Sequence, residues 1–172
     1  VSRGARVVVA DAAEAVTEVA EKLGCHGWQG DVSTVAGIEA LIAETEKVHG
    51  PVDLFFANAG IMGQSGLGDE ETWDTAIDVN LRAHIRAARL LIPGWQERGR
   101  GHFVSTASAA GLLTQLGQAE YSVTKHAAVG FAEWLAITYG GDGINVTCVC
   151  PMGVNTAMLQ AGTTAQNVTE KV

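Results

Sequence analysis

The sequence has few basic residues and no long apolar run, and each scarcity excludes a class of protein. Its 172 residues hold 11 lysines and arginines against 19 aspartates and glutamates, for a formal net charge of −8. Proteins that bind nucleic acid or acidic membrane surfaces normally carry a basic patch, so we expect neither partner. No apolar run approaches the roughly 20 residues that a membrane-spanning helix needs. We therefore expect a soluble protein.

Cysteine is also scarce, with three residues in the chain. Cys25, Cys148 and Cys150 do not have the spacing of metal ligands, so no metal site is expected. Cys148 and Cys150 point the same way from a predicted buried strand, where a free cysteine behaves as a small hydrophobe. These features indicate a reducing, cytoplasmic compartment.

Short apolar or β-branched runs alternate with longer stretches of helical period. The composition, 47% hydrophobic and 17% charged, is typical of one packed domain. The alternation predicts a doubly wound α/β fold, with a parallel sheet and helices on both faces. Strands are expected near Ala5–Ala10, His26–Gly30, Val52–Ala57, Gly101–Thr106 and Ile144–Val149. Helices are expected over Ala12–Leu23, Thr34–His49, Glu70–Arg98 with a break at Pro93, and Tyr121–Tyr139.

Two of the expected strands contain continuous apolar runs. Val7-Val8-Val9 and Leu54-Phe55-Phe56 are typical of strands buried on both faces of a sheet. Two polar or glycine-rich segments, Gly60–Gly68 and the tail from Gln160, are expected to be mobile loops near a ligand.

Polar or turn residues follow every predicted strand. In an open parallel sheet, ligands bind beyond the carboxyl ends of the strands. The residues at those positions are Asp11, Asp31, Asn58, Ser108 and Pro151. The sequence therefore predicts a ligand site along this edge of the sheet.

The strongest local signal is Tyr121-Ser122-Val123-Thr124-Lys125. Residues four apart share a helix face, so the Tyr121 and Lys125 side chains can act on one ligand. A free phenol titrates near pH 10, and a neighbouring ammonium lowers that pKa, which favours a proton acceptor for an alcohol. Alone, such a pair is more often an ordinary surface feature. Ser108 strengthens the interpretation, because its hydroxyl could hydrogen-bond a substrate carbonyl.

Together these residues resemble the pattern of the short-chain dehydrogenase/reductase family in order and spacing, from Val7 to Met158. The matching elements are Asn58-Ala59-Gly60, Asn80, Ser108, Tyr121-x-x-x-Lys125 and Pro151…Thr156. The resemblance implies that Tyr121 is the catalytic acid/base and that Ser108 polarises the substrate oxygen. It implies that Lys125 binds the nicotinamide ribose and lowers the pKa of Tyr121, and that Asn80 holds a proton-relay water. The implied reaction interconverts a secondary alcohol and a ketone.

The resemblance also implies a nicotinamide cofactor. Asp11 is similar to the family's acidic residue that accepts hydrogen bonds from the adenosine ribose and repels a 2′-phosphate, which favours NAD over NADP. The other implied cofactor contacts are Asp31, Val32, Asn58, Ala59, Gly60, Tyr121, Lys125, Pro151, Val154 and Thr156. Structural alternatives stay open for both acids. Asp11 with Glu14 also fits a helix N-cap with a capping box, and Asp31 could cap a loop.

The sequence departs from the family pattern in three places. Met152 stands where the family has glycine, and Ala57 where it has a first asparagine. The glycine-rich segment that would meet the pyrophosphate is absent. We expect a strand and a glycine-rich turn before Val1, placed between the first and third strands, and a further helix and strand after Val172.

Other expectations concern assembly and alternative functions. The resemblance implies a homo-oligomer, a dimer or tetramer, formed through Glu70–Arg98 and Tyr121–Tyr139. Apolar residues there exceed one core-facing stripe: Ala83, Ala87, Leu90, Leu91, Ala128, Phe131, Ala132 and Leu135. A catalytically silent NAD-binding regulatory protein, or an epimerase or dehydratase of the extended relatives, remains an alternative. The substrate is not readable, because the pocket would be shaped by Met62–Gly68, Leu112–Gln118 and Met158 onward.

Overall fold

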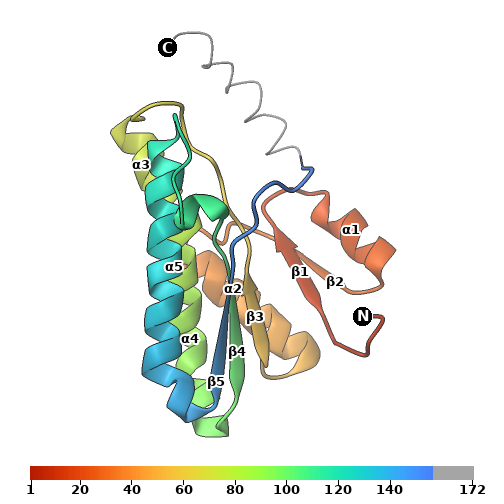
Figure 1. Ribbon diagram of the computed structural model, residues 1–172. Helices are drawn as coiled ribbons and strands as arrows, with labels where there is room; N and C mark the ends of the chain where they lie inside the picture. The colour runs from red at the N-terminus through yellow and green to blue at the C-terminus, as the bar shows by residue number, and fades with distance from the viewer. Residues whose placement is uncertain (157–172) are drawn as a thin grey trace.

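Two parallel sheets form the centre of the protein, seen in a computed structural model that describes residues 1–156 (Figure 1). In the first sheet β1 (Val8–Asp11) pairs with β2 (His26–Gln29). The second has the order β3-β4-β5 and is made of Leu54–Ala57, Gly101–Thr106 and Ile144–Val149. Every pairing is parallel, so the predicted α/β fold is confirmed. The predicted first and third strands begin later than expected, at Val8 and Leu54.

Helices cover these sheets. The helix α1 (Val16–Leu23) lies against the β1–β2 sheet, while α2 (Val35–His49), α4 (Ala83–Arg98) and α5 (Ala119–Tyr139) cover one face of the other sheet (Figure 1). That second group encloses the main core, which consists of Ile38, Val52, Ala57, Ala87, Ala88, Leu91, Ile92, Trp95, Phe103, Leu135 and Ile144. Trp95 is fully buried, and its indole N–H donates to the Val52 carbonyl at 2.7 Å. The indole is therefore both packed and hydrogen-bonded, as a buried tryptophan requires.

The outer side of β3 is not covered in the described part of the chain. Leu54 is 52% exposed and Phe56 is 53% exposed, whereas Phe55 and Ala57 face the core. The prediction that this strand is buried on both faces is therefore wrong for residues 1–156. The physical reason is that strand side chains alternate between the two faces of a sheet, so among residues 1–156 Leu54 and Phe56 point away from the helix α4 that packs on the face of Phe55 and Ala57. The edges of β1 and β3 that would flank a further strand have no strand partner among these residues.

The predicted break at Pro93 is wrong, because α4 runs through that residue. Leu91, Ile92 and Trp95 bury the surrounding turn in the core, which offsets the hydrogen bond that proline removes. The predicted helical stretch Glu70–Arg98 is instead interrupted before Pro93. Between α3 (Glu70–Ile77) and α4, residues Asp78–Arg82 form a π-helical turn. Such turns insert an extra residue into a helix and are frequent at functional sites.

Most of the apolar residues of α4 and α5 that were expected to exceed one core-facing stripe are buried in the single chain. The buried ones are Ala83, Ala87, Leu91, Ala128, Ala132 and Leu135. Leu90 on α4 is 41% exposed. On α5 the large apolar side chains that are exposed are Val123, Trp134 and Ile137. The apolar composition of these helices is thus explained mainly by packing within the subunit.

Candidate active site

The α5 helix carries the predicted pair, one turn apart. Its alanine-rich sequence favours the helix, which ends at Tyr139 with Gly140 as its C-cap. Lys125 is 3% exposed, and its Nζ atom lies 5.7 Å from the centroid of the Tyr121 ring. The same Nζ donates to the Thr106 carbonyl, 2.9 Å away at the end of β4. Burial lowers the pKa of Lys125 to about 8. The structure therefore holds an ammonium group close to a phenol, at the carboxyl end of the sheet.

Ser108 follows β4 on a turn that packs against α5. It is 6% exposed, and its Oγ accepts a hydrogen bond from the Ala110 N–H at 3.1 Å, which caps the short helix Ala109–Gly111. Gly111 has no room for a side chain, because a Cβ there would lie 2.5 Å from the Lys125 carbonyl oxygen. The Ser108 turn is thus in contact with the backbone of the residue that supplies the ammonium.

Asn80 lies in the π-helical turn and is fully buried. Its Oδ1 accepts from the Ile61 N–H at 2.8 Å, and its Nδ2 donates to the Ile61 carbonyl at 2.9 Å and to Thr124 Oγ1 at 3.0 Å. A Cβ on Gly60 would lie 3.2 Å from Lys125 Nζ and 3.3 Å from Asn80 Oδ1. Gly60, Asn80 and Lys125 therefore converge, as the family resemblance implies.

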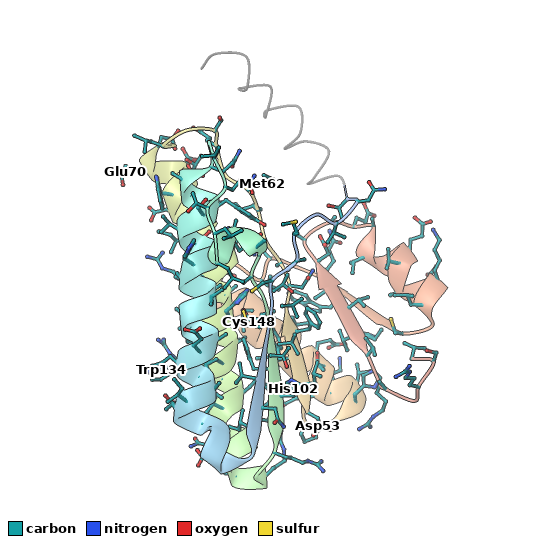
Figure 2. The ribbon with its side chains drawn as sticks, viewed as in Figure 1. Asp53, Met62, Glu70, His102, Trp134 and Cys148 are labelled. Atoms are coloured by element: carbon teal, nitrogen blue, oxygen red, sulfur yellow. The ribbon has the colours of Figure 1, made fainter. Side chains whose placement is uncertain are left out.

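The segment Gly60–Gly68, expected to be a mobile loop, is attached to its surroundings. Besides the bonds to Ile61, the Gly66 N–H donates to the Gly117 carbonyl at 2.8 Å and the Ala119 N–H donates to the Gly66 carbonyl at 3.2 Å. The segment leads into α3, whose N-cap Asp69 accepts from the Thr72 N–H. Figure 2 places Met62 at the end of the molecule opposite Asp53 and His102, which stand at the amino ends of β3 and β4.

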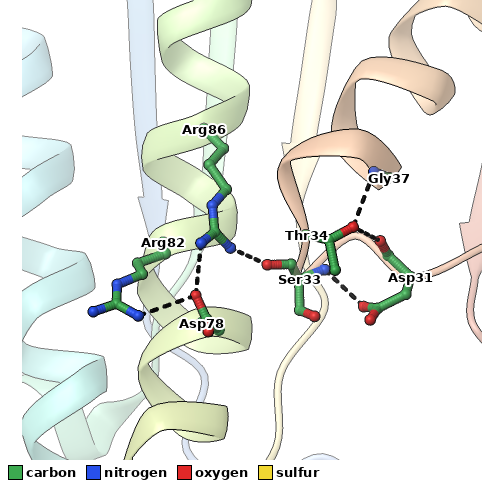
Figure 3. Close-up of polar contacts among 7 residues, drawn as sticks. All are labelled: Asp31, Ser33, Thr34, Gly37, Asp78, Arg82 and Arg86. Carbon is green, nitrogen blue, oxygen red and sulfur yellow. Dashed lines mark hydrogen bonds and ion pairs between the residues drawn. The ribbon is translucent and has the colours of Figure 1, made fainter.

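Asp31 lies in the turn between β2 and α2 (Figure 3). Its Oδ1 accepts from the Ser33 N–H at 2.8 Å, and hydrogen bonds from Ser33 hold the pKa of Asp31 below its usual value. Arg86 on α4 donates to the Ser33 carbonyl and forms an ion pair with Asp78 at 2.7 Å. Sequence reasoning missed Arg86, which fixes the turn that carries Asp31 and Val32. Val32 itself packs against the core.

Asp11 is the last residue of β1 and is exposed. Its Oδ1 accepts from the Ala13 N–H at 2.8 Å, which forms a local turn. The α1 helix begins later, at Val16, and its N-cap Ala15 makes no side-chain cap. The alternative that Asp11 caps this helix is therefore wrong. The carboxylate stands at the carboxyl end of β1 without a helix-capping role.

The remaining predicted contacts lie after β3 and β5. Asn58 Oδ1 accepts from Thr106 Oγ1 at 3.1 Å, and Ala59 is exposed. The Pro151 carbonyl accepts from the Ala109 N–H at 2.8 Å, which ties the end of β5 to the Ser108 turn. Val154 is exposed, and its carbonyl accepts from Thr156 Oγ1 at 3.3 Å. Met158 and the expected loop beyond it lie outside the described residues.

The polar groups at this edge of the sheet fit a nicotinamide dinucleotide. Lys125 is a buried ammonium with three N–H donors, one of which reaches Thr106, so it suits the hydroxyl groups of a ribose. Gly60 keeps the space beside Lys125 Nζ clear of a Cβ. Asp11 and Asp31 present carboxylates at the ends of the neighbouring strands. Among residues 1–156, no group of three or more His, Cys, Asp or Glu side chains could hold a metal ion.

Within residues 1–156, none of the helices combines the length and apolar character needed to cross a membrane.

Sequence reasoning also missed Glu120 and Thr124, two buried polar residues on α5. The helical period of the segment gave no sign of their partners, which come from the π-helical turn, from α3 and from the Gly60–Gly68 segment.

Comparison with known proteins identifies the family. The model of the short chain dehydrogenase family matches residues 1–167. The chain is 30% identical over 169 residues to D-beta-hydroxybutyrate dehydrogenase of Cupriavidus necator, covering 92% of this chain and 65% of that protein. It is 35% identical over 156 residues to inactive 2-(S)-hydroxypropyl-CoM dehydrogenase 2 of Xanthobacter autotrophicus, covering 88% of this chain and 68% of that protein.

Solved structures agree. The crystal structure of 3-ketoacyl-(acyl-carrier-protein) reductase from Brucella melitensis, complexed with NADH, superimposes with a TM-score of 0.88 at 28% identity. The match covers 92% of this chain and 70% of that one. The chain spans less than two thirds of the length of the first curated relatives that it matches, 65% and 63%. The fold, the convergence of Gly60, Asn80 and Lys125, and these matches agree that the chain belongs to the short-chain dehydrogenase family.

Proposed function

We propose that the protein is a nicotinamide-dependent oxidoreductase that interconverts a secondary alcohol and a ketone. The observation that carries the proposal is the buried Lys125 ammonium, 5.7 Å from the Tyr121 ring. A cation within about 6 Å of a ring centroid is attracted to the aromatic ring, so Lys125 and Tyr121 are held together as one pair. Family membership and the names of the relatives, a hydroxybutyrate dehydrogenase and a ketoacyl reductase, support the same reaction class.

In this proposal Tyr121 transfers one proton, Ser108 holds the substrate oxygen and Lys125 holds hydroxyl groups of the cofactor ribose. Tyr121 takes the proton of the substrate hydroxyl during oxidation and returns it during reduction. Ser108 donates its hydroxyl hydrogen to the substrate oxygen as negative charge develops there. Lys125 binds ribose hydroxyls, and Asn80, whose side chain holds Ile61, is proposed to hold a proton-relay water. When bound, the nicotinamide ring supplies or accepts the hydride.

NAD is proposed over NADP because of Asp11. Its exposed carboxylate ends β1, and a 2′-phosphate near it would bring two anions together. No basic residue follows Asp11 before Lys22. Asp31 and Val32 are proposed to contact the adenine, and Asn58, Ala59, Gly60, Pro151, Val154 and Thr156 the rest of the cofactor. The NADH in the structure from Brucella melitensis supports the choice of NAD over NADP.

We propose that a parallel strand lies between β1 and β3, as the expected position of the family's first strand requires. The supporting observation is that, within residues 1–156, β1 and β3 each have one edge without a strand partner. A cytoplasmic location and a homo-oligomer, a dimer or tetramer, are further proposals. Leu90, Trp134 and Ile137 offer outward apolar surface for an oligomer on α4 and α5.

A catalytically silent binding protein is the second candidate, since one relative is named as inactive. The two functions separate in one experiment. The protein is incubated with NAD or NADH and a panel of secondary alcohols and ketones that includes D-β-hydroxybutyrate and a 3-ketoacyl ester, and NADH absorbance is followed. Turnover of any member supports the proposed function. NADH binding without turnover across the panel supports the silent alternative.

A further inference from the structure

Glu120, the residue before Tyr121, is a buried carboxylate whose position needs explanation. It is 0% exposed, and no cation among residues 1–156 forms an ion pair with it. Its Oε2 accepts from the Gln64 N–H at 2.9 Å, and its Oε1 accepts from Thr72 Oγ1 at 2.7 Å. A buried charged group is costly unless it is hydrogen-bonded, so these two donors are the main compensation.

Two glycines enclose this carboxylate. A Cβ on Gly63 would lie 1.7 Å from Glu120 Oε2, and a Cβ on Gly68 would lie 1.6 Å from Glu120 Oε1. Both glycines also have left-handed backbones, with φ of +79° and +68°. The glycine-rich segment thus wraps both oxygens of one side chain. This accounts for the glycines at 63 and 68, which no cofactor contact explains.

The same segment is attached to α5 at two further points. Gly66 exchanges backbone hydrogen bonds with Gly117 and Ala119, immediately before Glu120. At its start, Ile61 is held by Asn80, which also donates to Thr124 Oγ1 on α5. The segment is therefore fixed to the first two turns of α5, on either side of Tyr121 in sequence.

We propose that Glu120 is a positioning residue that holds Gly60–Gly68 as one wall of the substrate pocket, at a fixed place relative to the Tyr121 hydroxyl. It acts through the segment and transfers no proton itself. The effect of Glu120 on substrate kinetics rests on the proposed function. The attachment that it provides can be measured without turnover.

Glu120→Ala removes both acceptors, so the wall loosens at Gln64 and at Thr72, while the backbone bonds at Gly66, the bonds between Ile61 and Asn80, and the side chains of the proposed active site remain. We expect KM for the ketone to rise about 10-fold to 100-fold, as for loss of hydrogen bonds to a charged group. We expect kcat and the NADH dissociation constant to change by less than about 3-fold, because Gly60 beside Lys125 stays in place through the bonds between Ile61 and Asn80. Glu120→Gln should restore KM. Its Oε1 can accept from Gln64 and its Nε2 can donate to Thr72 Oγ1, which still reaches Asp69.

Amide hydrogen exchange provides a readout independent of catalysis. The Gln64 amide should exchange at least about 10-fold faster in Glu120→Ala than in the parent, because it loses its acceptor. Glu133→Ala is the matched control, an exposed glutamate on the same helix, and should leave Gln64 exchange unchanged.

A second pair of variants covers the case in which Glu120→Ala does not fold. Thr72→Val removes one donor to the carboxylate, and Thr75→Val removes a hydroxyl on the same helix that donates only to the Glu71 carbonyl. KM and Gln64 exchange should rise in Thr72→Val and stay at parental values in Thr75→Val.

Unchanged KM and unchanged Gln64 exchange in Glu120→Ala would overturn the inference. So would a Glu120→Gln variant as impaired as Glu120→Ala, because charge and not positioning would then matter. If the parent turns over no member of the panel, the proposed function fails by itself, and Gln64 exchange alone decides the attachment.

Discussion

Lys125 Nζ lies 5.7 Å from the centroid of the Tyr121 ring and 2.9 Å from the Thr106 carbonyl oxygen. The carbonyl bond anchors the ammonium to the end of β4, while the helix spacing sets its place beside the phenol. Because the group is 3% exposed, its charge is poorly solvated, and burial lowers the pKa of Lys125 to about 8. This pair is the centre of the predictions on chemistry.

Tyr121→Phe should abolish turnover while NADH still binds. The change deletes the transferable proton and keeps the ring, so the proposed cofactor contacts of Lys125 and Asp11 should persist. The measurements are initial rates on the best substrate of the panel and an NADH fluorescence titration. A variant with parental rates would show that Tyr121 is not the acid/base.

Lys125→Met should change how stability depends on pH. The pKa of Lys125 is lowered from 10.5 to about 8 by burial, so the folded state disfavours the cation. Below about pH 8 both folded and unfolded chains carry the proton, and the burial cost is fully present. As pH rises from about 8 to 10.5 the folded chain loses its proton first, so the free energy of unfolding increases, by an amount on the order of 3 kcal/mol.

Urea unfolding at pH 7.5 and at pH 10 tests whether the free energy of unfolding increases with pH. Other groups titrate in this window, so the comparison is between the parent and Lys125→Met, which has no proton to lose. The parent should gain stability relative to the variant on going to pH 10. Parallel pH profiles would contradict the depressed pKa.

Asp11→Ala should relax cofactor choice. Removing the carboxylate removes its repulsion of a 2′-phosphate, so kcat/KM with NADP should rise and kcat/KM with NAD should fall. Each change is expected to be about 10-fold, the value of one hydrogen bond or one close charge pair. Asp53→Ala, an exposed aspartate directly before β3, is the control. A parent that prefers NADP would defeat the assignment.

Gly101→Ala should destabilise the fold without touching the site. A Cβ there would lie 2.2 Å from Trp95 Cδ2, and Trp95 is fully buried, so about 1–3 kcal/mol of stability should be lost. Gly130→Ala on α5 is the matched control, because nothing lies within 4 Å of its added Cβ. That change should instead stabilise by roughly 0.5–1 kcal/mol through helix propensity. Thermal unfolding of both variants gives the comparison, and equal effects would contradict the packing.

The sequence by itself determined the fold class and the family. Alternation of apolar runs with helical periods is a local property, and it predicted the five strands found in residues 1–156. The spacing of Tyr121 and Lys125 sets their shared face by helix geometry alone. Element ends were less accurate, because caps and turns such as the one at Asp11 compete with helix over a few residues.

Only the tertiary structure decided what lies between these elements. At Pro93 the burial of the surrounding turn overrode the local tendency to break the helix, and the interruption moved to Asp78–Arg82. Glu120 reaches partners 56 and 48 residues away, at Gln64 and Thr72. Local sequence patterns carry no record of such pairings, since they arise when the packing of distant segments excludes water and each buried polar group must find a donor or acceptor within reach.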